Sequence, residues 1–357
     1  MIDQSFWKGR RVLITGHTGF KGGWLSLWLT QLGAKVFGYA IDSPSTPCFY
    51  EEAKVSSSLE QSINGDIRDA GLFAKAVSDV SPEIVIHMAA QSLVKESYTD
   101  PSSTYSTNIM GTVNLFEAVR KTPSVKVILN ITSDKCYENN ESNLGYSEAD
   151  PMGGYDPYSS SKGCAELISS AYRKSFFQQE GIAIATARAG NVIGGGDWAK
   201  NRIIPDAIRA FTSNKPLLVR NPVATRPWQH VLEPLLGYIL LCQQLMHCPN
   251  DFSEGWNFGP SKQDEESVSK IADTMVKNWG EQASWELDKE SHPHEAHILR
   301  LDCSKANDKL NWKTTWSLDR ALSETIQWYK TWDDKKDMHQ FSLLQIENYQ
   351  KEHLVNE

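Results

Sequence analysis

The sequence predicts an α/β fold, a doubly wound parallel sheet with a smaller C-terminal α/β lobe. Three observations lead to this prediction. Short apolar runs rich in β-branched residues recur along the first half of the chain and are typical of buried parallel strands. Segments with apolar residues at helical spacing separate these runs. Small or polar residues directly follow the runs, where such a sheet gathers its ligand-binding residues.

The first strand–turn–helix unit contains the most informative motif. We expect a strand at residues 11–14 and a helix whose apolar face begins at Trp24. In this setting one glycine permits a tight turn, the next lets the backbone approach a pyrophosphate, and the third lets the helix pack closely on the strand. The sequence therefore predicts a Rossmann-type dinucleotide site. Its expected residues are Gly16, His17, Thr18, Gly19, Phe20, Lys21 and Gly22.

The second strand, expected at residues 35–40, leads to Asp42. A carboxylate about 20 residues beyond the last glycine is suited to bind a ribose 2′-hydroxyl. The same carboxylate would repel a 2′-phosphate, so the sequence favours NAD over NADP as the cofactor.

Two further strand ends are expected at the same edge of the sheet. A strand ending near Asn64 leads to the first group, Asp66 and Ile67. A buried strand over residues 84–90 ends at the second group, Ala89, Ala90 and Gln91. We expect the first group at adenine and the second along the nicotinamide ribose. Helix packing on the sheet explains the small residues of the second group equally well.

Catalytic side chains are expected where the strand at residues 127–131 ends and the helix at residues 157–177 begins. Tyr158 and Lys162 lie one turn apart on that helix. An ammonium group near a phenol favours the phenolate, so we expect Lys162 to lower the pKa of Tyr158. Ser133 is expected to hydrogen-bond the same substrate oxygen. An ordinary amphipathic helix with a Tyr/Lys pair is the alternative interpretation.

The glycine turn, Ser133, Tyr158 and Lys162 together resemble the extended short-chain dehydrogenase/reductase family, in the branch that acts on nucleotide-activated sugars. The resemblance covers almost the whole chain. Within that branch, Asp134-Lys135 resembles the 4,6-dehydratases of CDP-sugars, whereas dTDP-glucose enzymes carry aspartate and glutamate there. The resemblance implies CDP-glucose as the substrate and a 4-keto-6-deoxy product. It also implies that five side chains hold the sugar nucleotide: Asn191, Arg202, Arg226, Asn257 and Arg300.

The implied reaction assigns a role to each catalytic residue. Tyr158, Lys162 and Ser133 serve the oxidation at C4, and Asp134 protonates the departing 6-hydroxyl. Lys135 exchanges the C5 proton, which requires a neutral amine. A charged Lys135 that orients water or stabilises an enolate remains an alternative, as does a structural Asp-Lys pair. A nucleotide-sugar 4-epimerase or reductase, and a non-catalytic nucleotide-binding protein, remain alternative functions.

The expected organisation has two domains. Residues 1–189 form the NAD-binding domain and residues 190–357 the sugar-nucleotide-binding domain, with segments near 225–260 returning to the first. In relatives, helices corresponding to residues 103–120 and 158–177 form a four-helix interface. The resemblance therefore implies a homodimer, with a tetramer as an alternative.

Composition excludes several other classes of protein. The 357 residues carry a net charge of −8, which disfavours general nucleic-acid binding. No apolar run approaches the ~18 residues of a membrane span, and no signal peptide is expected. Six cysteines without C-x-x-C spacing indicate reduced thiols and a cytoplasmic location.

The histidines at 292, 294 and 297 are expected in a loop over the nucleotide, and no metal is expected.

Overall fold

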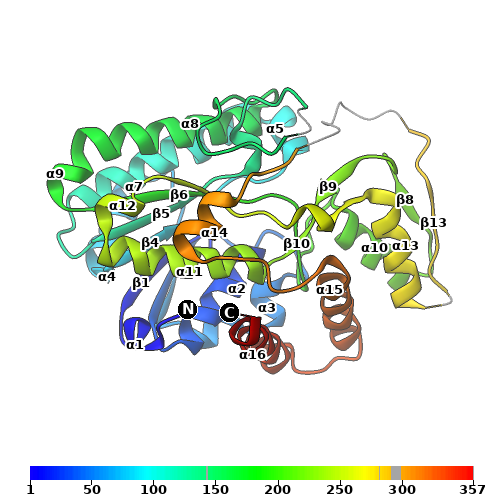
Figure 1. Ribbon diagram of the computed structural model, residues 1–357. Coiled ribbons are helices and arrows are strands. Elements are labelled where there is room, and N and C mark those ends of the chain that lie inside the picture. The colour runs from blue at the N-terminus through cyan, green and yellow to red at the C-terminus, as the bar shows by residue number, and fades with distance from the viewer. Residues whose placement is uncertain (142–143, 281, 291–298, 357) are drawn as a thin grey trace.

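A seven-stranded parallel sheet forms the centre of the protein (Figure 1), seen in a computed structural model that describes residues 1–141, 144–280, 282–290 and 299–356. The strand order is β11-β6-β5-β4-β1-β2-β3. The chain builds outward from β1 in one direction and then returns to add β4 on the other side, so the order reverses between β1 and β4. The strands are β1 (Arg11–Thr15), β2 (Lys35–Ala40), β3 (Gln61–Asn64), β4 (Ile84–His87), β5 (Val127–Ile131), β6 (Ala183–Arg188) and β11 (Gly255–Asn257).

Helices cover both faces of this sheet, so the predicted doubly wound α/β fold is confirmed (Figure 1). Val12 and Ile14 of β1 belong to the larger apolar core, beneath α2 and α11, whereas Leu13 belongs to the core beneath α4 and α7. This alternation follows from the two-residue period of a strand. The covering helices are α2 (Phe20–Gln31), α4 (Ala70–Val80), α7 (Gly111–Arg120), α8 (Pro157–Tyr172) and α11 (Leu232–His247).

A smaller lobe lies beyond the carboxyl ends of the strands (Figure 1). Its two main helices are α10 (Ile203–Thr212) and α13 (Val268–Trp279). They pack on each other and on β8. Three short strand pairs complete the lobe: β7 (Val192–Ile193) with β10 (Gln229–His230), β8 (Leu217–Val219) with β13 (Trp285–Leu287), and β9 (Thr225–Pro227) with β12 (Glu265–Ser267).

The two long helices expected from the sequence are present, each interrupted by a wider π-helical turn. One consists of α6 (Pro101–Tyr105), the turn η2 (Ser106–Met110) and α7. The other is α8 followed by the turn η4 (Arg173–Phe177). A π-turn adds one residue to the helical repeat, and the α-helical periodicity of the sequence does not predict this insertion.

The C-terminal helices return to the first lobe. Helices α15 (Leu318–Asp333) and α16 (Met338–Asn356) pack together, and the indole of Trp328 donates to the hydroxyl of Ser342 at 3.0 Å. Helix α16 also packs on α2. The other helices are α1 (Gln4–Trp7), α3 (Phe49–Glu52), α5 (Val94–Thr99), α9 (Gln178–Glu180), α12 (Pro249–Phe252) and α14 (Ser304–Leu310).

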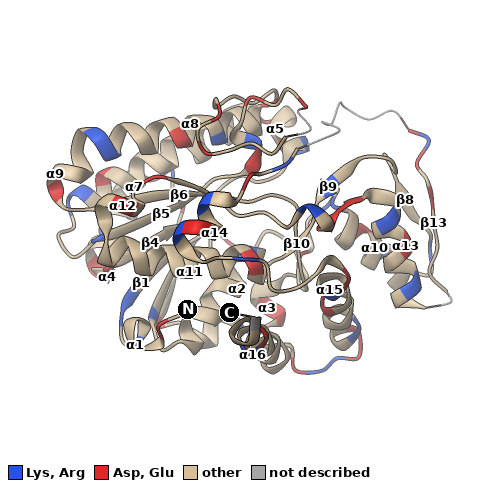
Figure 2. Cartoon of the chain, viewed as in Figure 1, with Lys and Arg blue, Asp and Glu red and all other residues tan. Residues whose placement is uncertain are grey.

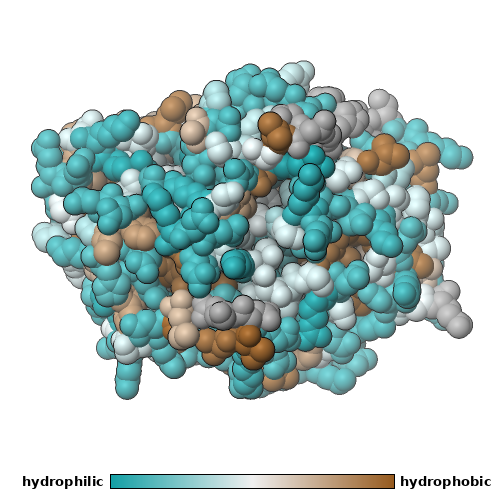
Figure 3. All heavy atoms as spheres, in the orientation of Figure 1, coloured by the Kyte–Doolittle hydropathy of each residue, from teal (hydrophilic) through white to brown (hydrophobic). Residues whose placement is uncertain are grey.

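Charged residues are distributed over both lobes (Figure 2), and the face seen in Figure 3 is mainly hydrophilic. Within the described part of the chain, no helix has the length and apolar character needed to cross a membrane. The histidines at 292, 294 and 297 lie outside the described residues.

Candidate active site

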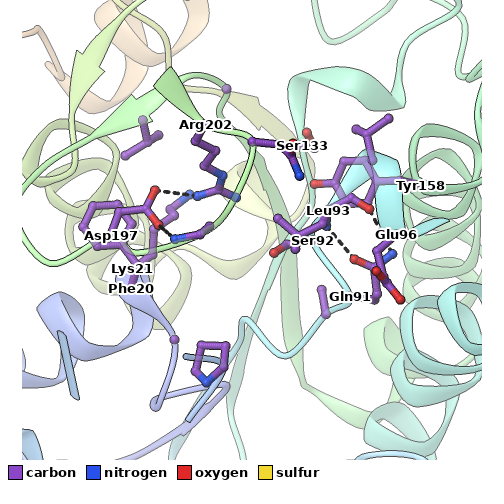
Figure 4. A pocket seen from close by; sticks show the side chains of 18 of the residues that line it. Phe20, Lys21, Gln91, Ser92, Leu93, Glu96, Ser133, Tyr158, Asp197 and Arg202 are labelled. Carbon is purple, nitrogen blue, oxygen red and sulfur yellow. Dashed lines mark hydrogen bonds and ion pairs between the residues drawn. The ribbon is translucent and has the colours of Figure 1, made fainter. Parts of the chain in front are cut away.

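A cleft of about 1230 Å³ runs between the sheet and the smaller lobe. Its walls combine the glycine turn and the ends of β2, β4, β5 and β6 with residues of the smaller lobe. Lys21, Asp197 and Arg202 occupy one side in Figure 4, while Tyr158 and Gln91 lie on the other. Most residues that were predicted to bind the cofactor or the substrate therefore line this one cavity.

The glycine turn between β1 and α2 leaves no room for side chains at two positions. Gly16 has a φ of +77°, and a Cβ atom there would lie 2.8 Å from the nitrogen of Ala89. A Cβ atom at Gly22 would lie 2.2 Å from the carbonyl oxygen of Gly16. Gly19 caps α2 without a side-chain hydrogen bond, so the first backbone N–H groups of the helix face the cleft uncapped by a side chain. This arrangement suits a pyrophosphate.

His17 is the one residue of the predicted glycine segment whose side chain leaves the cleft. It is fully buried, and its Nε2 lies 2.7 Å from the hydroxyl of Ser62. The ring fills the space over Gly38, where a Cβ atom would approach it to 2.3 Å. Burial lowers the pKa of His17 to about 4, so the ring is neutral at working pH.

The other residues that were predicted to bind the cofactor line the cleft, where they follow the glycine turn and the ends of β2, β3 and β4. They are Thr18, Phe20, Lys21, Asp42, Asp66, Ile67, Ala89, Ala90 and Gln91. The carboxylate of Asp42 accepts a hydrogen bond from the side-chain amide of Asn64. Asp66 pairs with Arg68 through both carboxylate oxygens, and these hydrogen bonds hold its pKa below the usual range.

Tyr158 lies at the start of α8 with 8% of its surface exposed, and its hydroxyl is hydrogen-bonded to that of Ser133. Burial raises the pKa of Tyr158 to about 12, and the Ser133 hydrogen bond and the charge of Arg202 only partly oppose this rise. The expectation that Lys162 lowers this pKa is therefore wrong for this structure. The Lys162 ammonium instead donates to the carbonyl oxygen of Ile131 at 3.1 Å.

Asp134 is 2% exposed and lines the cleft next to Ser133. Its Oδ1 accepts a hydrogen bond from the hydroxyl of Ser133 at 2.9 Å, while its Oδ2 has no hydrogen-bond partner among the described residues. The carboxylate packs on Gly190, where any Cβ atom would overlap it. Lys135 follows on the short turn η3 (Asp134–Cys136) and also lines the cleft.

Three of the five predicted substrate residues line the cleft: Asn191, Arg202 and Arg226. Asn257 does not line it, because its buried side chain donates to the carbonyls of Tyr146 and Asp302 and accepts from Tyr137. Arg300 also lies outside the cleft lining and forms an ion pair with Glu265 on β12.

Two features of the cleft were not predicted. Asp197, which lines the cleft, forms an ion pair with Arg202 at 2.8 Å. Lys21 donates to the hydroxyl of Tyr238 at 2.9 Å. Tyr238 lies in the apolar helix α11, and nothing in its sequence surroundings signals a polar contact.

Residues 13–325 match the GDP-mannose 4,6 dehydratase family. The chain belongs to this family. A CDP-glucose 4,6-dehydratase from Salmonella typhimurium is 54% identical over 354 residues, and the match covers 98% of both chains. The predicted resemblance to enzymes of nucleotide-activated sugars is thus confirmed.

Solved structures of other enzymes share the fold. The dTDP-glucose 4,6-dehydratase of Streptomyces venezuelae, crystallised with NAD, superimposes with a TM-score of 0.77 at 21% identity, over 92% of this chain and 99% of that one. A UDP-glucose-4-epimerase from Stenotrophomonas maltophila with bound NAD gives a TM-score of 0.78 at 20% identity, over 91% and 99%. Dehydratases and epimerases therefore use the same scaffold, and the residues of the site must distinguish them.

Proposed function

We propose that this protein is a lyase that converts CDP-glucose into CDP-4-keto-6-deoxyglucose and water with bound NAD. One observation above all supports this proposal: Ser133, Asp134 and Tyr158 meet at one point of a cleft that also contains a glycine turn. The identity of 54% with a CDP-glucose 4,6-dehydratase supports CDP-glucose among the nucleotide sugars.

The residues of the cleft fit NAD. The uncapped N-terminus of α2 and the glycines at 16, 19 and 22 suit the pyrophosphate. Asp42, at the end of β2, suits an unphosphorylated adenosine ribose. Asp66, Ile67, Ala89, Ala90 and Gln91 then line the path from the adenine to the nicotinamide. When bound, NAD supplies a hydride acceptor for C4 and returns the hydride at C6.

Tyr158 takes the proton of the sugar 4-hydroxyl during the oxidation. Its hydrogen bond to Ser133 and the positive charge of Arg202 favour the phenolate, while burial opposes it. Lys162, on the next turn of the same helix face, adds a positive charge to this wall of the cleft. Ser133 also orients the substrate oxygen.

Asp134 and Lys135 carry out the elimination. Once C4 is a ketone, the C5 proton is acidic, and Lys135 takes it and later returns it. Asp134 gives its proton to the departing 6-hydroxyl, and its carboxylate, whose buried Oδ2 has no hydrogen-bond partner among the described residues, lines the cleft beside Ser133. Arg202, Arg226 and Asn191 hold the diphosphate, to which guanidinium groups bind in bidentate fashion.

The test incubates the purified protein and NAD separately with CDP-, dTDP-, UDP- and GDP-hexoses. Product mass and the alkaline absorbance of a 4-keto sugar are followed. Loss of one water from CDP-glucose, without net accumulation of reduced cofactor, is the expected result. An unchanged mass with altered stereochemistry would identify an epimerase. No turnover would contradict an enzymatic role with these sugars.

We further propose a homodimer built on the helical segments at residues 103–120 and 158–177. Three exposed apolar side chains of these segments support it: Tyr105, Met110 and Leu167. Light scattering of the eluted protein measures the mass directly, and Leu167→Glu is expected to shift it to that of a monomer.

We also propose two domains, residues 1–189 for NAD and 190–357 for the sugar nucleotide. Helix α11 and strand β11, from the second of these ranges, pack on or join the main sheet. A cytoplasmic location is part of the proposal, and the six unpaired cysteines support it.

A further inference from the structure

A buried polar network lies directly behind the catalytic wall of the cleft. We name it the Glu166 network, after its central carboxylate on α8. Tyr158, Lys162 and Glu166 occupy successive turns of one face of that helix, and all three side chains are buried. The other members of the network are Thr132, Tyr137, Thr186 and Arg188.

Every oxygen of the Glu166 carboxylate is used. Arg188 donates from Nε to Oε1 at 2.9 Å and from Nη2 to Oε2 at 2.8 Å, which is a bidentate pair with each side chain 5% exposed. Thr186 donates to Oε2 at 2.7 Å, and the hydroxyl of Thr132 donates to Oε1. Although burial opposes ionisation, these hydrogen bonds hold the pKa of Glu166 below its usual range. The carboxylate is therefore charged and fixed in place.

The network connects directly to the catalytic segment. Thr132 precedes Ser133, so its bond to Glu166 ties the end of β5 to α8. On the other side of η3, Tyr137 accepts a hydrogen bond from Arg188 and donates to Asn257 at 2.7 Å. The segment that carries Ser133, Asp134 and Lys135 is thus held at both of its ends.

The network also acts on the charge of Lys162. Burial lowers the pKa of Lys162 to about 8, and the Glu166 carboxylate is the main charge that opposes this fall. The other titratable groups near Lys162 are the thiol of Cys136, the ring of His87 and the ammonium of Lys21. His87 is neutral, Lys21 has the same sign as Lys162, and burial raises the pKa of the Cys136 thiol well above its usual value, so none of the three replaces Glu166.

Stability alone does not account for a buried ion pair at this position, because packed apolar side chains of similar volume often serve the fold equally well. We propose that Glu166, clamped by Arg188, is a positioning residue of the reaction. It keeps Lys162 charged and, through Thr132 and Tyr137, fixes the segment that carries Ser133 and Asp134. This inference rests on the proposed dehydratase function.

The test compares Glu166→Gln, Thr132→Val and the conservative control Thr132→Ser. A further control, Glu233→Gln, removes another buried carboxylate, which lies outside the cleft lining. For each variant, kcat and KM for CDP-glucose are measured across the pH range, and folding is followed by circular dichroism and thermal unfolding.

Glu166→Gln is expected to lower kcat about tenfold or more at pH 8 and to move the alkaline limb of the profile to lower pH by about one unit, because Lys162 loses its counter-charge. KM is expected to change less than threefold, as for loss of an interaction needed in the transition state. Thr132→Val is expected to lower kcat about tenfold with the limb unmoved, and Thr132→Ser to restore it.

A purely structural role of the Glu166 network predicts a different result. If Glu166→Gln and Thr132→Val fold and behave like Glu233→Gln, with kcat within about threefold of the parent and an unmoved alkaline limb, the network is only structural. Should Glu166→Gln fail to fold, the Thr132 pair decides the question. A parent protein that does not dehydrate CDP-glucose overturns the proposed function first, before any variant is compared.

Discussion

Lys21 on α2 donates a hydrogen bond to the hydroxyl of Tyr238 on α11, across a distance of 2.9 Å. The two residues are 217 positions apart in the chain, and the contact joins the glycine turn to a helix on the same face of the sheet. Burial, together with the nearby charges of Lys162 and Arg202, lowers the pKa of Lys21 to about 7, while Asp134 opposes this fall. Lys21 therefore changes charge near neutral pH, beside the helix N-terminus that suits a pyrophosphate.

The charge of Lys21 is expected to make NAD affinity depend on pH. The ammonium is present below about pH 7 and is lost as pH rises through that value, so the attraction for an anionic cofactor falls in the same direction. We expect the Kd for NAD to rise severalfold between about pH 6 and pH 8 in the parent, and to change much less in Lys21→Met. Fluorescence titration with NAD measures this without turnover. Tyr238→Phe keeps the lysine and is expected to keep the pH dependence, and an equal dependence in Lys21→Met would contradict the assignment.

Replacement of Tyr158 by phenylalanine is expected to lower kcat by about 10² to 10⁴, the range for loss of a general acid–base group. The ring is buried and only the hydroxyl is removed, so the fold is expected to persist. Steady-state rates and an NAD titration separate the two effects. NAD binding within a few fold of the parent supports a role in proton transfer, whereas turnover at the parental rate would exclude Tyr158 as the base.

The core strands and the cleft were predictable from the sequence because both depend on local patterns. Buried parallel strands such as β1 and β4 are continuous apolar runs, and the residue after each run lies at the ligand edge by topology. Tyr158 and Lys162 share one helix face through a four-residue spacing that is itself visible in the sequence. These features require no knowledge of distant contacts.

Electrostatic effects and long-range contacts were not predictable in the same way. The pKa of Tyr158 depends on how deeply the folded lobes bury it, and the sequence contains no measure of that depth. His17 belongs to the glycine motif, yet it turns toward Ser62 because Gly38 on the neighbouring strand leaves space for its ring. Asn257 is removed from the cleft by three partners, Tyr137, Tyr146 and Asp302, which lie far away in the chain.

Asp134→Asn is expected to stop the reaction after the oxidation. Asparagine preserves the shape of the side chain over Gly190, but it cannot give a proton to the departing hydroxyl. We expect kcat to fall by about 10² or more, with a transient absorbance of reduced nicotinamide when substrate is added. Stopped-flow absorbance measures the transient. Loss of turnover with no reduced cofactor would instead mean that Asp134 is needed for the oxidation.

Lys135→Met addresses the C5 proton separately. The parent, reacted in deuterated water, is expected to place deuterium at C5 of the product, because the base exchanges with solvent before it returns the proton. Lys135→Met is expected to lose product formation by about 10² or more and to retain the oxidation transient. Mass spectrometry of the product and the same absorbance measurement provide the readouts. Deuterated product formed at the parental rate would assign the C5 proton to another group.

Glu233 links the C-terminal helix to the core and is a fully buried carboxylate. It accepts hydrogen bonds from the hydroxyl of Tyr349 at 2.6 Å and from the backbone N–H groups of Trp316 and Thr315 at 2.8 and 3.0 Å. Burial raises its pKa from 4.5 to about 7, against the influence of these donors. The folded protein therefore holds this proton more tightly than the unfolded chain.

This raised pKa predicts how stability depends on pH. The contribution is fully present below about pH 4.5 and is lost as pH rises through about 7, because the unfolded chain ionises first. At about 1.4 kcal/mol per pKa unit, the loss is on the order of 3 kcal/mol. Glu233→Gln cannot ionise, so it is expected to destabilise the protein more at pH 5 than at pH 8, relative to the parent at each pH. Urea unfolding at both pH values measures the difference in free energy of unfolding, and an equal destabilisation at both would mean that Glu233 ionises in the folded protein as it does in the unfolded chain.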